Sequence, residues 1–240
     1  KNKDQSYFLW TLTQNELRYC LFPIGEYTKP QVRKLAKKFG LTNADKKDSQ
    51  GICFLGQVTL SDFLKNYIPE RKGKIVSLSG EKIGTHTGAM FYTIGQRHLG
   101  ISNLKNQISK PGENPKPLYV AEKDVKKNTL VVAEGSDNPA LYRREIELKE
   151  VNFIDPELRT ENYKLKIAIY ARVRYRQQLT RATLTATRVK RQVKSKISSH
   201  SHVPVTMSLT FDHPVKFIAP GQSVVFYSKS GVMLGGGIII

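Results

Sequence analysis

Apolar side chains near the start of the chain recur at the three-to-four-residue spacing of helices. Thr13 and Glu16 form a capping-box pattern, and Thr28 followed by Pro30 is a second start signal, with Gly40 as its stop. The pattern predicts four helices: one opened by Asp4 or Ser6, one from Thr13 to near Pro23, one from Thr28 to Gly40, and one from Leu60 to Tyr67.

The helix predicted after Thr28 is amphipathic. Its apolar and basic positions fall on opposite faces: Val32, Leu35, Ala36 and Phe39 against Arg33, Lys34, Lys37 and Lys38. An apolar stripe at this spacing packs against a core, whereas the cations remain solvated.

From Gly73 onward the pattern changes to short apolar runs separated by Gly, Asn and Pro, which is typical of strands. The runs cover 74–76, 91–94, 118–120 and 128–133, and then 146–153, 163–175, 182–189, 205–211 and 223–227. The second group has the rhythm of a small antiparallel barrel. Residues 105–117 are predicted to be a loop, and residues 190–202 a hairpin tip.

Composition adds a strong charge to this picture. The 240 residues include 39 Lys or Arg against 20 Asp or Glu, a formal net charge of +19. The length allows two or three small domains, and no apolar run approaches the roughly 20 residues that a membrane helix needs. The excess of cations excludes an acidic surface and favours a polyanionic partner, most often nucleic acid.

Basic residues concentrate between Tyr163 and Phe211, where eleven Lys or Arg occur without one Asp or Glu. Arg172, Arg174 and Arg176 occupy alternate positions, so in a strand they would share one face. Guanidiniums on one face repel each other unless an anion lies between them. The strip therefore predicts a surface that follows an RNA backbone, with a solvated barrel face as the alternative.

The chain has two cysteines, which are too few for a disulfide framework. Cys20 has apolar neighbours at the end of a predicted helix, so we interpret it as a core residue. Cys53 lies among glycines and follows Lys46 and Lys47, whose charges could favour a nucleophilic thiolate. From this pattern alone, reactive and structural roles for Cys53 remain equally open.

A second dense cluster runs from Gly84 to Gly88 and from Tyr92 to Arg97. It combines small residues with His86 and Gln96. This combination suits a loop packed close to a ligand or to Cys53, but a turn-rich β-domain also uses many glycines. The cluster alone therefore has little specificity.

Several segments closely resemble the tRNA-specific 2-thiouridylases, in the same order along the chain. They span essentially all of the sequence: residues 3–9, 22–26, 47–54, 92–97, 174–177, 220–227 and 234–237. Enzymes of this family replace the C2 oxygen of the wobble uridine, position 34 of certain tRNAs, with sulfur. ATP adenylates that oxygen, and a cysteine persulfide supplies the sulfur.

The resemblance implies roles for individual residues. Cys53 matches the persulfide-bearing cysteine. The positions that match the family's tRNA contacts are Lys3, Asp4, Gln5, Arg174, Tyr175 and Gln222. It also implies ATP as a substrate, a persulfide sulfur donor, and as partners tRNA and a sulfur-relay or cysteine desulfurase protein.

One departure from the family is large. Its Ser-Gly-Gly-x-Asp-Ser phosphate-binding loop and its other catalytic cysteine are absent from these residues and are expected upstream of Lys1. The resemblance then implies a truncated, multidomain α/β plus β protein that is itself inactive. We expect residues 1–58 to be the helical tail of a Rossmann-like ATP-pyrophosphatase (PP-loop) domain, 59–143 a small β-rich central domain, and 144–240 an antiparallel β-barrel that binds tRNA.

Two alternatives remain. One is a non-catalytic RNA-binding module built on the same barrel, which the sequence preceding Lys1 in the parent gene would test. The other is a metal site at His200 and His202, which has little support because no cysteine lies near them. The default location is the bacterial cytoplasm, although a mitochondrial or plastid enzyme would look the same.

Overall fold

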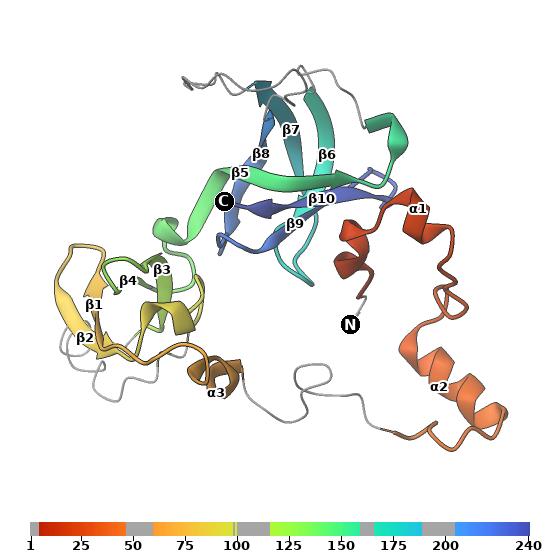
Figure 1. Ribbon diagram of the computed structural model, residues 1–240, viewed down its shortest axis with the longest axis horizontal. Coiled ribbons are helices and arrows are strands. Elements are labelled where there is room, and N and C mark those ends of the chain that lie inside the picture. The colour runs from red at the N-terminus through yellow and green to blue at the C-terminus, as the bar shows by residue number, and fades with distance from the viewer. Residues whose placement is uncertain (1–4, 47–59, 98, 100–115, 159–165, 189–204) are drawn as a thin grey trace, which may run out of the picture.

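The computed structural model describes residues 5–46, 60–97, 99, 116–158, 166–188 and 205–240. It contains an N-terminal helical segment, a small central sheet and a C-terminal barrel (Figure 1). The start of the helical segment lies against the barrel, and the central sheet lies beside the barrel's other end. The predicted combination of a helical piece, a β-rich middle domain and an antiparallel barrel is confirmed.

The N-terminal segment contains a 3-10 helix, η1 (Gln5–Thr11), and the α-helices α1 (Gln14–Leu17) and α2 (Lys29–Lys38), with α3 (Leu60–Lys65) opening the central part. Both capping signals hold. Glu16 accepts from the backbone N–H of Thr13 at 2.7 Å, and Gln31 accepts from that of Thr28 at 2.7 Å. The first helix is 3-10 rather than α, and α1 is much shorter than predicted.

The residues after α1 are more exposed than their apolar character predicts. Cys20 is only half-buried, and its Sγ donates to the carbonyl of Glu16 at 3.4 Å. Our interpretation of Cys20 as a core residue is therefore wrong. Helix α1 ends at Leu17, before Cys20, and Leu21, which follows Cys20, is 90% exposed. Other large apolar side chains of this region are also exposed: Tyr19, Phe22, Ile24, Tyr27, Phe39 and Leu41.

The central sheet has the strand order β2-β1-β4-β3. Its strands are β1 (Gly73–Ser77), β2 (Lys82–His86), β3 (Leu118–Asp124) and β4 (Thr129–Glu134), and β1 pairs in parallel with β4. One face is packed, with a core of Ile75, Ile83, Ala89, Leu99, Val120, Leu130 and Val132. The strand predicted at 91–94 is wrong, because these residues form the end of the 3-10 helix η2 (Ala89–Phe91) and a turn.

The barrel is closed and entirely antiparallel, in the order β10-β5-β8-β7-β6-β9. Its strands are β5 (Tyr142–Phe153), β6 (Lys166–Arg172), β7 (Thr180–Arg188), β8 (Val205–Lys216), β9 (Ser223–Tyr227) and β10 (Met233–Ile239). Two short 3-10 helices, η4 (Pro139–Leu141) and η5 (Pro156–Leu158), flank β5. Inward residues such as Leu184, Leu209, Phe211 and Phe226 are fully buried and fill the interior.

The predicted arginine face of a single strand is wrong. β6 ends at Arg172, and Arg176 has a left-handed φ of +68°. A turn follows the strand: Gln177 N donates to Arg174 O at 3.1 Å, and the Gln177 side chain accepts from Val173 N at 3.2 Å. Because this turn breaks the alternation of the strand, the three arginines do not lie on one face of a single strand.

Candidate nucleic-acid interface

Helix η1 lies on the outer wall of the barrel. The Tyr7 hydroxyl donates to the carbonyl of Ser223 at 2.7 Å, and the Asn152 amide donates to the carbonyls of Trp10 and Leu12 at 2.8 and 2.9 Å. Tyr7 and Trp10 are buried against Val225 and Tyr227. β9 is thus buried on both faces, one inside the barrel and one under η1.

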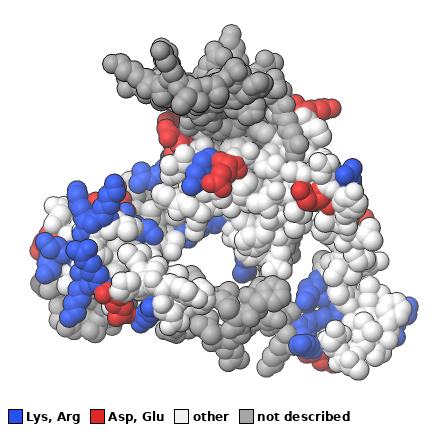
Figure 2. Space-filling model, in the orientation of Figure 1, with Lys and Arg blue, Asp and Glu red and all other residues white. Residues whose placement is uncertain are grey.

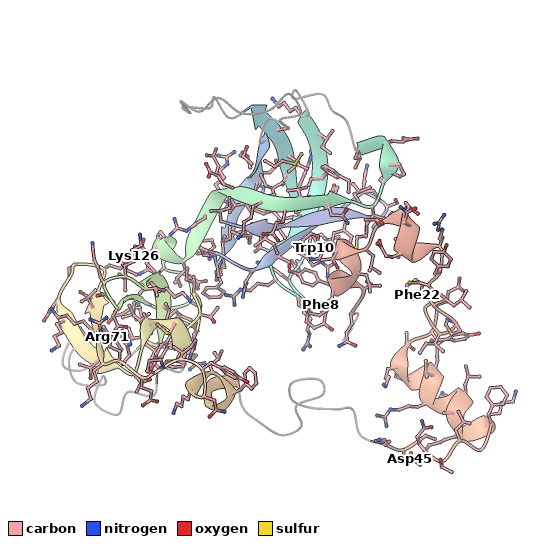
Figure 3. All side chains as sticks on the ribbon, in the orientation of Figure 1. Phe8, Trp10, Phe22, Asp45, Arg71 and Lys126 are labelled. Carbon is pink, nitrogen blue, oxygen red and sulfur yellow. The ribbon has the colours of Figure 1, made fainter. Side chains whose placement is uncertain are left out.

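This docking brings together three aromatic rings, those of Tyr7, Phe8 and Tyr175. Figure 3 locates Phe8 beside Trp10 on η1. The Phe8 centroid lies 5.2 Å from that of Tyr7 and 5.3 Å from that of Tyr175, which follows β6. Phe8 is 55% exposed. An exposed aromatic face held by two neighbouring rings can stack with an unpaired base.

One arginine, Arg172, lies against the same group, and a second, Arg174, acts on it only through its charge. The Arg172 guanidinium sits 4.9 Å from the centroid of Tyr227. Burial, followed by the influence of Tyr227, raises the pKa of Tyr7 to about 12, while the charges of Arg172 and Arg174 act in the opposite direction. The cluster therefore combines aromatic surface with positive charge, which is the combination that binds single-stranded RNA.

Three buried polar atoms of this region lack a hydrogen-bond partner among the described residues. They are Arg172 Nε, Tyr175 Oη and Gln222 Oε1. Gln222 directly precedes Ser223, the residue that accepts from Tyr7. Since buried polar groups are normally paired, an accumulation of unpaired donors and acceptors is typical of a site that a bound molecule completes.

The structure brings some predicted site residues together and separates others. The segments that carry Gln5, Tyr175 and Gln222 meet where η1 contacts the barrel. Arg174 instead points toward the central sheet, where its guanidinium donates to the carbonyl of Ile94. Three predicted site residues lie outside the described residues: Lys3, Asp4 and Cys53.

Sequence reasoning missed the exposure of Phe8 and the docking of η1. The apolar spacing around Phe8 predicts a helix. That spacing does not tell which apolar residues of the helix are buried against the barrel and which stay exposed beside it. The only signal was the closeness of the aromatic residues to Lys3 and Asp4 in a segment that resembles a tRNA-contacting motif.

The second cluster has structural roles. His86 is buried, its Nδ1 accepts from Gly88 N at 2.9 Å, and its ring meets Tyr92 edge-on. Burial lowers the pKa of His86. Gln96 closes a turn by accepting from Thr93 N at 3.1 Å. Both side chains therefore stabilise the central domain.

Among the described residues, no group of three His, Cys, Asp or Glu side chains could hold a metal ion. The pair His200 and His202, the weakly supported alternative metal site, lies outside those residues. In the same part of the chain, every helix is too short or too polar to cross a bilayer.

Comparison with known proteins matches three family models in succession. They are described as the tRNA methyl transferase HUP domain (residues 1–57), the tRNA methyl transferase PRC-barrel domain (61–134) and the aminomethyltransferase beta-barrel domain (143–239). Together these models leave few residues of the chain unmatched.

Curated relatives match along nearly the whole chain. The tRNA-specific 2-thiouridylase MnmA of a Shewanella species is 41% identical, and MnmA 1 of Geobacillus kaustophilus is 43% identical, each over 99% of this chain. The chain spans 57% of the length of these relatives. Because three domain models match in succession and these relatives match along nearly the whole chain, this chain belongs to the tRNA-specific 2-thiouridylase family.

Proposed function

We propose that this chain is part of an enzyme that thiolates tRNA, transferring persulfide sulfur to C2 of the wobble uridine at position 34 in an ATP-dependent reaction. The observation that carries the proposal is the 41–43% identity to proteins named tRNA-specific 2-thiouridylases, along 99% of the chain. The exposed ring of Phe8 and the Arg172 guanidinium near it support an RNA substrate.

The proposed chemistry fits the residues of the sequence. The C2 oxygen of uridine is a poor leaving group, so its adenylation by ATP makes displacement feasible. The outer sulfur of a persulfide on Cys53 would then attack C2, because a thiolate-like sulfur is a strong nucleophile, and AMP would leave. The thiol of the family's other catalytic cysteine would break the S–S bond by forming a disulfide with Cys53, which leaves the sulfur on C2. The domain models carry the words methyl transferase, but a cysteine within a segment resembling the thiouridylase motif favours thiolation.

We further propose a division of labour among the domains. Residues 1–58 would contribute Cys53, 59–143 would form the central domain, and 144–240 would supply most of the tRNA contacts. ATP would bind at a Ser-Gly-Gly-x-Asp-Ser loop, a motif that these 240 residues do not contain. The 240 residues alone would then be inactive. A sulfur-relay or cysteine desulfurase protein would load Cys53, and we propose the cytoplasm as the location.

Replacing each cysteine in the full-length enzyme tests the assignment. Cys53→Ser should abolish formation of 2-thiouridine while tRNA binding persists. Cys20→Ser is the matched control and should retain activity, because Cys20 is half-exposed and the only described polar contact of its thiol is to Glu16 O. Mass spectrometry of digested tRNA measures the product, and thiolation by Cys53→Ser would contradict the proposal. Tight tRNA binding by a parent protein without thiolation would instead favour the RNA-binding module.

A further inference from the structure

Arg174 joins two parts of the chain that are far apart in sequence. Its Nε donates to the carbonyl of Phe217 at 3.0 Å, at the end of β8, and its Nη2 donates to the carbonyl of Ile94 in the central domain. The guanidinium carbon also lies 5.6 Å from the centroid of the Phe217 ring. The side chain is half-buried, so these contacts are shielded from water.

The carbonyl of Ile94 is available because of the turn that contains it. Gln96 N donates to Thr93 O at 2.9 Å, and Gly95 has φ of +82°, as in a type II turn. The carbonyl of the middle peptide takes no part in the bond that closes such a turn. Gly95 N donates to Val120 O at 2.7 Å, so the turn is attached to β3 of the central sheet.

Phe217 is held in place from several sides. It adopts φ of +60°, which is unfavourable for a bulky side chain. Its ring stacks on Tyr119 of β3 at 5.7 Å, and its N–H donates to Leu141 O at 2.9 Å. A Cβ at Gly95 would lie 2.6 Å from the Phe217 ring, so the turn and the ring are in close contact.

We propose that Arg174 is a positioning residue, a clamp that couples the Thr93–Gln96 turn of the central domain to the barrel. The planar fork of a guanidinium can bond two carbonyls in different directions while stacking on a ring, which an ammonium group cannot do. Carbonyl acceptors leave its positive charge unneutralised. Arg172 lies in the same basic segment but contacts Tyr227 within the barrel, so its described ring contact does not couple the two domains.

Hydrogen exchange measured by mass spectrometry tests this clamp without RNA. Arg174→Lys should speed exchange of the amides of Gly95 and Val120 by about tenfold or more, since local opening controls their protection. The barrel amides and the burial of Trp10 should not change. Arg172→Lys is the matched control and should leave the turn as protected as in the unmodified chain.

A second variant approaches the same contact from the central domain. Gly95→Ala should open the turn, because the added methyl group clashes with Phe217. The double variant with Arg174→Lys should exchange little faster than either single variant, because both substitutions break the same contact between the turn and the barrel. Additive effects would overturn the clamp, as would an unchanged turn in Arg174→Lys. Loss of Trp10 burial in Arg174→Lys would assign Arg174 to barrel stability and overturn it equally.

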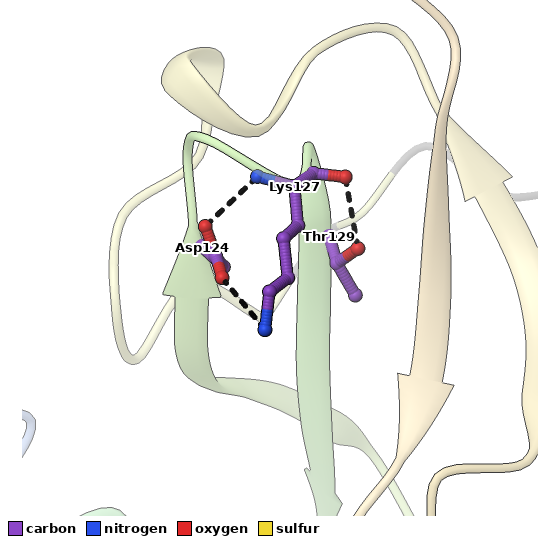
Figure 4. Close-up of polar contacts among 3 residues, drawn as sticks. All are labelled: Asp124, Lys127 and Thr129. Atoms are coloured by element: carbon purple, nitrogen blue, oxygen red, sulfur yellow. Dashed lines mark hydrogen bonds and ion pairs between the residues drawn. The ribbon is translucent and has the colours of Figure 1, made fainter.

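A different observation concerns the outer side of the central domain. Figure 2 shows Lys and Arg gathered there, and Figure 3 locates two of them, Arg71 and Lys126. We call this the central basic surface and define it by five exposed residues: Arg71, Lys72, Lys74, Lys126 and Lys127. Asp124 lies near one of them, with its Oδ2 3.8 Å from Lys127 Nζ across the β3–β4 turn (Figure 4).

The two segments that form this surface are fastened together by Asn128. This residue is buried and adopts φ of +52°. Its Nδ2 donates to the carbonyls of Arg71 and Lys72 at 2.9 and 3.1 Å, and its Oδ1 accepts from Ala89 N at 2.9 Å. These bonds of the Asn128 side chain join the two segments that carry the like charges, and a surface of one sign favours a bound polyanion.

We infer that the central basic surface binds the phosphate backbone of an RNA, as a contact separate from the aromatic and arginine cluster at η1. This inference rests on the proposed function for the identity of the polyanion. Exposed cations on two joined segments can contact phosphates, and binding there requires no base recognition.

A salt titration with an unmodified tRNA transcript tests the surface. Lys72→Ala, Lys74→Ala and Lys126→Ala combined should weaken binding about tenfold at low salt and lower the slope of log K against log salt by up to about three. Lys229→Ala, on the exposed turn after β9, is the control and should change neither quantity. Equal affinity and slope in the triple variant would overturn the inference, whereas absence of binding by the unmodified chain would count against the RNA substrate itself.

Discussion

Gly236 is a position where one methyl group should release η1 from the barrel. A Cβ at this residue would lie 2.7 Å from Trp10 Cδ2 and 2.7 Å from the carbonyl oxygen of Val224. The backbone of β9 cannot move without disturbing the barrel, so the indole must give way. Gly236→Ala is therefore expected to shift the equilibrium of η1 from docked to undocked.

The size of the effect follows from the contacts of η1. Tyr7 and Trp10 bury about 400 Å² together, which contributes about 10 kcal/mol at about 25 cal/mol per Å². The hydrogen bonds of Tyr7 to Ser223 and of Asn152 to η1 and Leu12 add about 3 kcal/mol. Ordering the 7 residues of η1 costs about 10 kcal/mol. Docking is then favourable by about 3 kcal/mol, and overpacking of about 1–3 kcal/mol removes much of it.

Fluorescence measures this directly, because Trp10 is the single tryptophan of the sequence. Trp10 is 5% exposed, so its emission should be blue-shifted and protected from acrylamide. Gly236→Ala should shift the emission to longer wavelength and raise quenching. Gly237→Ala is the control, since its Cβ would meet Val151 and not the indole. Unchanged emission and quenching in Gly236→Ala would refute the reasoning.

Further predictions concern titration and RNA affinity. Because the pKa of Tyr7 is raised from 10.0 to about 12, its stabilising effect is fully present below pH 10.0 and is lost as pH rises toward about 12; ultraviolet titration of Tyr7→Phe should lose the latest-ionising phenol. Because the pKa of His86 is lowered from 6.5 by burial, stability should be complete above pH 6.5 and fall as the solution becomes more acidic; urea unfolding of His86→Gln should show a weaker acid dependence, and an equal dependence would exclude His86 as the cause. Gln222→Ala should weaken tRNA binding with an unchanged salt slope, because the side chain carries no charge; a lowered slope in filter binding would contradict this.

Local signals in the sequence predicted much of the fold. The capping box at Thr13 formed as expected, and Thr28 precedes α2 as predicted, because each is closed by a side chain three residues away. The barrel was predicted from short apolar runs that recur between turn residues, a rhythm typical of antiparallel strands. The charge of +19 and the basic segment after Tyr163 also follow from composition alone. These features depend on neighbours in the chain and need no knowledge of distant contacts.

The site depended on contacts that no local pattern contains. The Tyr7 hydroxyl donates a hydrogen bond to Ser223, 216 positions away. This contact helps to dock η1 on the barrel, and Phe8 of the docked helix stays exposed. Tertiary structure also determined where the arginines lie. The turn at Arg176, which has a left-handed φ, follows the end of the strand, and Arg174 bonds to a carbonyl 80 positions away. Long-range docking of this kind depends on whether two distant surfaces fit in shape and on whether one of them has carbonyls free to accept hydrogen bonds. A sequence pattern contains only the spacing of residues along the chain.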